Sequence, residues 1–212
     1  MHRLKRFLMS TLLLGAATEC VAAAAVETRS TPAPSTSAPP LSIARRVLAV
    51  GDSLTAGYNV ARVDSYPSVL AQRMGIHVRN AGISGEMSDG LLRRLPGLLR
   101  SADYDTVLLC TGGNDILRGR PAQQLKRNLE RSIDLIRAAG ATPVLIAVPM
   151  LPFALVDHPI YAEVAAAKSV PMIGGFGLAL GREHFQADGL HPNAAGYRQI
   201  VEQLLRAADP GA

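Results

Sequence analysis

The sequence of 212 residues contains only two cysteines, Cys20 and Cys110. Cys20 falls in an N-terminal segment that we expect to be removed from the mature protein, which leaves Cys110 without a partner. No disulfide can then form within the chain, even in an oxidising compartment. Cys110 ends the apolar run Val107-Leu108-Leu109, and this position predicts a buried, inert thiol.

The sequence also lacks an apolar run of the roughly 20 residues that a membrane-spanning helix needs. The N-terminus has instead a basic segment at 2–6, an interrupted apolar stretch at 7–17 and small residues at 22–25. This order is typical of a secretory signal peptide. We therefore expect residues 1–26 to be a signal peptide and the protein to be exported, periplasmic or secreted, with no stable membrane span after cleavage.

Two other interpretations of this N-terminus stay open. An uncleaved anchor is disfavoured because the apolar stretch is short and interrupted. A lipid-modified N-terminus at Cys20 is disfavoured because Glu19 stands where a small residue would be needed. Whether the N-terminus stays attached to a membrane is therefore left undecided by the sequence.

A large excess of positive charge is absent as well. The chain has 22 basic and 17 acidic residues, which give a formal net charge of +5. Residues 1–26 hold Arg3, Lys5, Arg6 and Glu19, so their removal leaves 19 basic and 16 acidic residues, or +3. Proteins that bind nucleic acid usually carry a concentrated basic surface. We therefore expect no nucleic-acid partner, and for the oligomeric state we expect a monomer.

Segment 27–42 is rich in Pro, Ser, Thr and Ala and has too few apolar side chains to fold. We expect it to be a flexible linker, with one domain at 43–212. In that domain, short apolar runs alternate with helical patterns, which is typical of a parallel sheet covered by helices on both faces. The predicted fold is α/β, a three-layer α/β/α sandwich with a central, mostly parallel sheet of about five strands. The expected strands lie at 47–50, 76–78, 106–110, 144–148 and 170–173.

Helical periodicity is clearest at 121–140 and in the segment that follows Pro192. Segment 87–100 has a similar pattern, but Gly90 and Pro96 inside it predict a kink or two shorter helices. The apolar positions are Leu125, Leu129, Ile133 and Ile136 in the first segment and Tyr197, Ile200, Val201, Leu204 and Leu205 in the last.

Ser53 follows the first expected strand, and this position makes it a candidate nucleophile. In open α/β sheets, ligands bind at the carboxyl ends of the strands, so a serine there is exposed to substrate. A serine hydroxyl needs an adjacent base, and the base needs a group that fixes its tautomer. Asp188 and His191, three residues apart and followed by Pro192, can supply both from one loop.

Each of these residues has a simpler alternative role. Ser53 could cap the helix that follows it, while Asp188 and His191 could form a surface turn and a helix cap. A metal site on Asp188 and His191 is disfavoured, because the only further ligand nearby in the sequence is His184. We expect His184 to lie in an exposed loop. We therefore expect no metal and no cofactor.

Acyl transfer also needs donors for the negative charge that develops on the former carbonyl oxygen. Asn114 can offer its side-chain amide, and the backbone N–H groups of Gly85 and Ser53 can complete the set. The alternatives are a turn-stabilising asparagine and an ordinary loop glycine. Asp52 and Asp115 are expected to brace their loops by hydrogen bonds.

Four short blocks, in this order, resemble those of the GDSL or SGNH hydrolases. They are GDSLTAGY at 51–58, NAGISGE at 80–86, GGND at 112–115 and DGLHP at 188–192. The resemblance covers roughly residues 47–208 and is strongest to the exported bacterial thioesterase I, lysophospholipase and arylesterase subgroup. It implies a flavodoxin-like fold and a serine esterase that works without a cofactor. By this resemblance the site consists of Ser53 as nucleophile, His191 as base, Asp188 as its orienting carboxylate, and Ser53, Gly85 and Asn114 as oxyanion donors.

The expected substrates are small- or medium-chain acyl esters, thioesters or lysophospholipids, cleaved through an acyl-enzyme. A carbohydrate O-acetylesterase acting on cell-wall or extracellular polysaccharide is the alternative enzyme, and an exported binding protein without catalysis is the alternative from another class. The apolar connection after the fourth strand either forms a wall for the acyl chain or packs a short helix. Its residues are Met150, Leu151, Phe153, Leu155, Ile160 and Tyr161, with Met87 and Leu117 as weaker candidates for the same wall.

Overall fold

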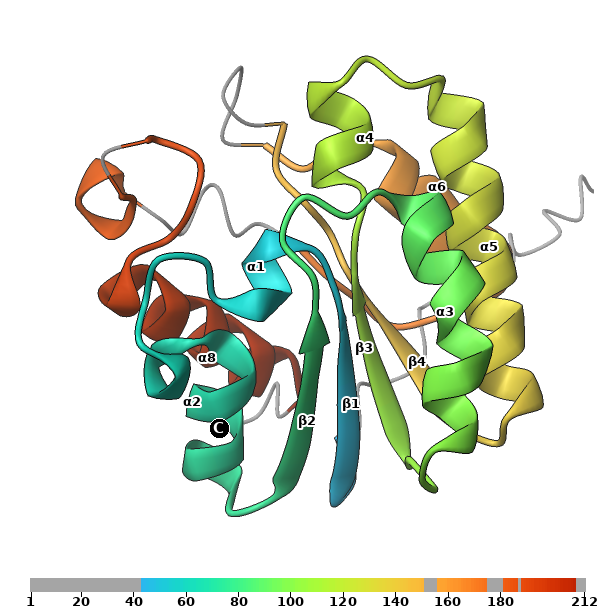
Figure 1. Ribbon diagram of the computed structural model, residues 1–212, viewed down its shortest axis with the longest axis horizontal. Helices are drawn as coiled ribbons and strands as arrows, with labels where there is room; N and C mark the ends of the chain where they lie inside the picture. The colour runs from blue at the N-terminus through green and yellow to red at the C-terminus, as the bar shows by residue number, and fades with distance from the viewer. Residues whose placement is uncertain (1–42, 151–155, 175–180, 187, 209–212) are drawn as a thin grey trace, which may run out of the picture. The chain divides into compact units, whose positions relative to one another are not determined.

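The computed structural model describes residues 43–208, except 151–155, 175–180 and 187. A five-stranded sheet lies at the centre, with the strand order β2-β1-β3-β4-β5, and every neighbouring pair is parallel. Helices cover both of its faces (Figure 1). The predicted three-layer α/β/α fold is thus confirmed. The strands are β1 (Arg46–Gly51), β2 (His77–Gly82), β3 (Thr106–Cys110), β4 (Thr142–Ile146) and β5 (Met172–Ile173).

The inner strands are apolar along their length because helices cover both faces of the sheet. Every residue of β3 is buried, and in β1 and β4 only the first residue, Arg46 or Thr142, is exposed. A parallel sheet that is covered on both faces requires continuous apolar runs, which is why these strands can be predicted from the sequence.

The edge strand β2 is longer than its apolar pattern indicates, since it continues from 78 to Gly82. Its extension contains Asn80, a residue that is uncommon in strands. Here the Asn80 side chain has specific partners: Nδ2 donates to the Thr55 carbonyl at 2.8 Å, and Oδ1 accepts from Gly82 N at 3.0 Å. The first contact joins the end of β2 to the segment after β1, and the second lies within β2 itself.

Two groups of helices form the outer layers (Figure 1). One face is covered by α3 (Ser88–Arg100), α5 (Ala122–Ala138) and α6 (Ile160–Lys168), and the other by α2 (Tyr66–Met74) and α8 (Ala194–Ala208). The shorter elements are α1 (Ser53–Ala56), η1 (Arg62–Asp64), α4 (Gly113–Leu117) and η2 (Arg182–His184).

The apolar residues predicted to face the core in α5 and α8 are buried, although Leu205 is only partly so. The final helix begins two residues after Pro192, because Asn193 caps it: Asn193 Oδ1 accepts from Gly196 N at 3.0 Å. The predicted position of both helices is therefore confirmed to within a few residues.

Of the two alternatives predicted for 87–100, a kink or two shorter helices, the second is wrong, because α3 is one helix that contains both Gly90 and Pro96. A proline inside a helix costs about 3 kcal/mol. Leu91 and Leu95 of this helix are fully buried, and the burial of each leucine contributes about 1.5–3 kcal/mol. Packing against the core therefore outweighs the unfavourable local sequence.

Cys110 is buried, with 3% of its surface exposed, and forms no disulfide. Burial raises the pKa of its thiol well above the ordinary value, so the reactive thiolate is disfavoured, as expected for an inert cysteine. The signal peptide and linker expected at 1–42 lie outside the described residues. Among the helices that the structure describes, none is long and apolar enough to cross a membrane.

Candidate active site

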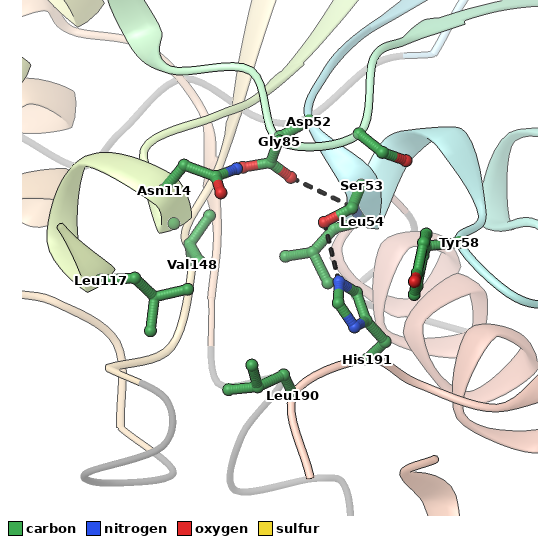
Figure 2. Close-up of a pocket in the computed structure, with 12 residues that line it drawn as sticks. Asp52, Ser53, Leu54, Tyr58, Gly85, Asn114, Leu117, Val148, Leu190 and His191 are labelled. Carbon is green, nitrogen blue, oxygen red and sulfur yellow. Dashed lines mark hydrogen bonds between the residues drawn. The ribbon is translucent and has the colours of Figure 1, made fainter. Parts of the chain in front are cut away.

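The predicted site residues lie at the carboxyl edge of the sheet. The chain proceeds from β1 to β2 on one side, and through β3, β4 and β5 on the other, so the strand order reverses between β1 and β3. Such a switch point leaves a crevice and is the usual ligand site of an open α/β sheet. Segments that follow β1, β2 and β3 meet there with the loop that precedes α8 (Figure 2).

Ser53 is the first residue of α1, and only Asp52 separates it from the end of β1. Asp52 caps this helix, since its Oδ1 accepts a hydrogen bond of 3.1 Å from Leu54 N while the residue is 1% exposed. Burial raises the pKa of Asp52 to about 6, although the Leu54 N–H and the charge of His191 lower it. Asp52 therefore braces the turn that carries Ser53, as expected from the sequence.

Ser53, His191 and Asp188 form a continuous chain of hydrogen bonds. His191 Nε2 lies 2.9 Å from Ser53 Oγ (Figure 2), and His191 Nδ1 lies 2.7 Å from Asp188 Oδ2. A carboxylate can only accept a hydrogen bond, so Nδ1 carries the proton. In the neutral imidazole, Nε2 is then the acceptor for the Ser53 hydroxyl.

The Asp188 carboxylate is held by its own loop. Its Oδ1 accepts hydrogen bonds from the backbone N–H groups of Leu190, at 2.9 Å, and His191, at 3.0 Å. Partial burial raises the pKa of Asp188, but the hydrogen bonds from the His191 ring and from these N–H groups outweigh it and hold the pKa below its ordinary value. The group is therefore ionised at neutral pH and can orient the imidazole.

Gly85 lies in a tight turn that exposes a backbone donor. Glu86 N donates to the Ile83 carbonyl at 3.2 Å, and Gly85, the third residue of this turn, has φ +79°. Type II turns require such a positive φ at this position, which favours glycine. Neither the Gly85 N–H nor the Ser53 N–H donates a hydrogen bond within the described part of the chain, so both are free for a ligand.

Asn114 presents its side-chain amide from α4. Its Nδ2 donates to the Glu86 carbonyl at 3.1 Å, and because a primary amide has two N–H groups, one is left for a ligand. The preceding Gly112 has φ +118°, and a β-carbon there would lie 2.5 Å from the Tyr161 hydroxyl. Glycine is therefore required for the close approach of this loop to α6.

Asp115 joins α4 to α3. It is 3% exposed, and its carboxylate accepts hydrogen bonds from Ser88 N, at 2.8 Å, and Ser88 Oγ, at 2.7 Å. A carboxylate at the N-terminus of a helix is also favoured by the helix dipole. The expected bracing role of Asp115 is thus what the contacts show.

A pocket of about 250 Å³ opens between these groups. Figure 2 shows Asn114 and Gly85 across from Ser53 and His191. The apolar lining consists of Leu54, Leu117, Val148 and Leu190.

The candidate wall residues have different positions. Leu117 lines the pocket, whereas Ile160 and Tyr161 are buried core residues of α6, so for these two the packing role is the observed one. Tyr161 Oη donates to the Thr111 carbonyl at 2.8 Å. Met87 and Met150 are not among the described lining residues. The remaining candidates, Leu151, Phe153 and Leu155, lie outside the described residues.

Tyr58 is a site residue that the sequence patterns do not single out. Its ring centroid lies 4.6 Å from that of His191, with an angle of 42° between the planes, and the residue is 41% exposed. Gln186 Nε2 donates both to the Tyr58 carbonyl, at 2.7 Å, and to the Pro192 carbonyl, at 3.0 Å. Tyr58 therefore joins the turn after Ser53 to the histidine loop. The available signal was its place at the end of the block 51–58.

Within the part of the chain that the structure describes, there is no cluster of three or more His, Cys, Asp or Glu side chains that could hold a metal ion. The expectation of an exposed loop at His184 is wrong, because this residue ends η2 with its side chain only 25% exposed. Its Nδ1 accepts a hydrogen bond of 3.0 Å from Gly181 N, which turns the ring back against its own segment.

Comparisons with known proteins agree with this geometry. Residues 49–199 match the sequence model of the GDSL-like Lipase/Acylhydrolase family. Esterase TesA of Pseudomonas aeruginosa is 31% identical over 179 residues, which cover 79% of this chain and 89% of that protein. Thioesterase 1/protease 1/lysophospholipase L1 of Escherichia coli K12 is 33% identical over 174 residues, which cover 77% of this chain and 83% of that protein. A crystal structure of the psychrotrophic esterase EstA from Pseudoalteromonas sp., inhibited by monoethylphosphonate, matches with a TM-score of 0.68 at 26% identity, over 77% of this chain and 96% of that one.

Proposed function

The chain belongs to the GDSL-like lipase/acylhydrolase family, and from this premise we propose that it is a serine esterase with Ser53 as its nucleophile. The observation that carries the proposal is the chain of hydrogen bonds from Ser53 Oγ through His191 to Asp188, with distances of 2.9 and 2.7 Å. This arrangement meets the three requirements of an activated serine: a hydroxyl, a base in contact with it, and a carboxylate that orients the base.

In acylation, His191 Nε2 takes the proton of Ser53 as Oγ attacks the carbonyl carbon of the substrate. Asp188 stabilises the imidazolium that forms. His191 then gives this proton to the leaving alcohol or thiol, and the acyl group stays on Ser53 as an ester. In the second half of the reaction, His191 takes a proton from water, the resulting hydroxide equivalent attacks the acyl-enzyme, and Ser53 recovers its proton.

In both halves the carbonyl oxygen becomes an oxyanion, which needs donors that already face it. We assign this role to the backbone N–H groups of Ser53 and Gly85 and to the second N–H of the Asn114 amide. The free N–H groups of the two backbone donors support the assignment, as does the shared pocket that all three residues line.

The proposed substrates are small- or medium-chain acyl esters, thioesters or lysophospholipids. The apolar lining formed by Leu54, Leu117, Val148 and Leu190 suits an acyl chain better than the hydroxyl groups of a sugar. The names of the relatives, an esterase and a thioesterase/lysophospholipase, point to the same class. We further propose export through the signal-like segment 1–26, because its basic, apolar and small-residue regions follow one another in the order that secretion requires.

The test is hydrolysis of p-nitrophenyl and CoA esters over a range of chain lengths, together with labelling by a fluorophosphonate. Ser53→Ala should abolish both hydrolysis and labelling, because no other described hydroxyl is hydrogen-bonded to the His191 ring. Ser84→Ala is the matched control, since Ser84 lines the same pocket without a hydrogen bond to His191, and this variant should still be labelled. Labelling or turnover that persists in Ser53→Ala would overturn the nucleophile assignment.

Chain-length dependence separates the two enzyme alternatives. Activity on butyryl and longer acyl groups supports the proposed esterase. Cleavage restricted to acetyl groups on polysaccharide would replace it with the O-acetylesterase, and no turnover of any activated ester would leave only a binding protein.

A further inference from the structure

Glu86 is in contact with three segments of the candidate site, although it lies outside the set of proposed catalytic groups. Its backbone carbonyl accepts from Asn114 Nδ2 at 3.1 Å. Its carboxylate is paired with Arg94 of α3, through Arg94 Nε at 2.9 and 3.0 Å and Nη2 at 2.7 Å. Arg94 Nη2 also lies 3.3 Å from the carbonyl of Gly51, two residues before Ser53.

This ion pair is more enclosed than the others near it. The side chains of Glu86 and Arg94 are 11% and 22% exposed, whereas those of the neighbouring pair Asp89 and Arg93 are 32% and 72% exposed. An enclosed, two-pronged contact between a guanidinium and a carboxylate fixes both position and direction, because the planar groups face each other. Exposed pairs such as Asp89–Arg93 contribute little.

The backbone leaves Glu86 little other support. The turn from Ile83 to Glu86 has one internal hydrogen bond, Glu86 N to Ile83 O at 3.2 Å, and Ile83 N is bonded to the Gly51 carbonyl at 3.0 Å. Arg94 therefore adds a second link from this turn to the end of β1. A displacement of the whole turn would move both the Glu86 carbonyl, which accepts from the Asn114 amide, and the N–H of Gly85.

We propose that the Glu86–Arg94 ion pair is a positioning device for the oxyanion donors: it fixes the Glu86 carbonyl, which orients the Asn114 amide beside Gly85 and Ser53. This inference rests on the proposed serine esterase function. Neither residue is among those that line the pocket, so both are positioning residues. Their loss should affect the transition state, where the oxyanion exists, much more than the binding of substrate.

The first experiment compares Glu86→Gln and Arg94→Met with Asp89→Asn and Arg93→Met on the same helix turn. Displacement of a catalytic donor by a fraction of an ångström to 1 Å costs up to about a hundredfold. We expect kcat for a p-nitrophenyl ester to fall about ten- to a hundredfold in the first two variants, with KM changed by less than about threefold. Arg94→Lys should recover only part of the loss, since lysine lacks the planar fork. Equal effects in the control variants, or a change confined to KM, would overturn the proposal.

A double-mutant cycle separates positioning from a general loss of structure. If Glu86 and Arg94 act through the Asn114 amide, the loss from Arg94→Met should largely disappear in an Asn114→Ala background. If the double variant instead loses kcat by the product of the two single-variant factors, Arg94 does not act through Asn114. Urea midpoints of all variants, followed by circular dichroism, identify any variant that loses activity through unfolding.

A readout without turnover keeps this inference distinct from the proposed function. In ¹⁵N-labelled protein, the side-chain amide resonances of Asn114 can be assigned by their absence in Asn114→Ala. Arg94→Met should shift these resonances, and Arg93→Met should leave them unmoved. We expect the same difference when both substitutions are made in the inactive Ser53→Ala variant. An unmoved Asn114 amide refutes the positioning role even if the protein is an esterase, whereas absent esterase activity with a moved amide refutes only the proposed function.

Discussion

Asp52 is a buried carboxyl group one residue before the proposed nucleophile, and its ionisation should contribute a pH-dependent part of the stability of the protein. The residue is 1% exposed, and Oδ1 accepts from Leu54 N. Burial raises its pKa from 3.8 to about 6; the Leu54 N–H and the charge of His191 oppose the increase, and the charge of Asp115 adds to it. Each pH unit between the folded and unfolded pKa is worth about 1.36 kcal/mol, so this difference corresponds to about 3 kcal/mol.

The direction follows from proton linkage. Between pH 3.8 and about 6, the folded state holds the Asp52 proton more tightly than the unfolded state does. The free energy of unfolding therefore falls as the pH rises. The stabilising contribution of protonated Asp52 is complete below pH 3.8 and is lost as the pH rises through about 6.

Asp52→Asn removes this titration while it keeps an oxygen acceptor for Leu54 N. The free energy of unfolding of the variant minus that of the wild type should increase by about 2.4 kcal/mol between pH 4 and pH 7, because at pH 4 the unfolded carboxyl is already partly ionised. A constant cost from the new amide N–H groups shifts the whole curve without changing this slope. Urea unfolding followed by far-UV circular dichroism provides the measurement, since the chain has no tryptophan. A difference that is constant with pH to within about 0.5 kcal/mol would show that Asp52 titrates normally.

Asp105→Asn is the control with the opposite sign. Hydrogen bonds from the side chain and backbone N–H of Arg46 lower the pKa of the partly exposed Asp105 carboxyl. Its stabilising contribution is present above the unfolded pKa and is lost as the pH falls through the lower, folded pKa. The free energy of unfolding of Asp105→Asn minus that of the wild type should therefore change only in the acid range. There it should fall as the pH rises, whereas the corresponding difference for Asp52→Asn increases.

Three further predictions concern the candidate site. Asn114→Ala should lower kcat about a hundred- to a thousandfold with the fold intact by circular dichroism, and a folded, fully active variant would exclude its role as an oxyanion donor. Asp188→Asn should lower kcat/KM roughly 10³- to 10⁴-fold, because the imidazole loses the partner that fixes its tautomer; a loss below about tenfold would contradict the assigned role. Tyr58→Ala should lower kcat/KM about two- to tenfold through loss of the ring contact with His191, while Tyr58→Phe should stay near the wild type. Equal losses in the two Tyr58 variants would show that the hydroxyl, and not the ring, is what matters.

Much of the fold is legible in the sequence because its signals are local. The apolar run at 106–110 predicts both the first and the last residue of β3, since a strand that is covered on both faces must be apolar throughout. The apolar residues between 121 and 140 recur at helical spacing and predict α5, because a helix that packs on the core buries one face. Each short block that contains Ser53, Gly85 or Asn114 follows a predicted strand, so parallel topology alone brings the blocks to one edge of the sheet.

Other features depend on which segments touch. The continuity of α3 through Pro96 depends on burial of Leu91 and Leu95, which no local pattern around a proline reveals. The end of β2 depends on contacts of the Asn80 side chain with a segment about 25 residues away.

The sequence by itself determined the α/β class, the order of the elements and the residue types available for ester cleavage, because these follow from hydrophobic spacing and from the chemistry of individual side chains. Tertiary structure alone decided that Tyr58 packs on His191 and that Arg94 joins Glu86 to the end of β1. A local pattern reports the burial and backbone preference of its own segment. Contacts between distant segments depend on how whole helices and strands pack, and that information is distributed over the entire core.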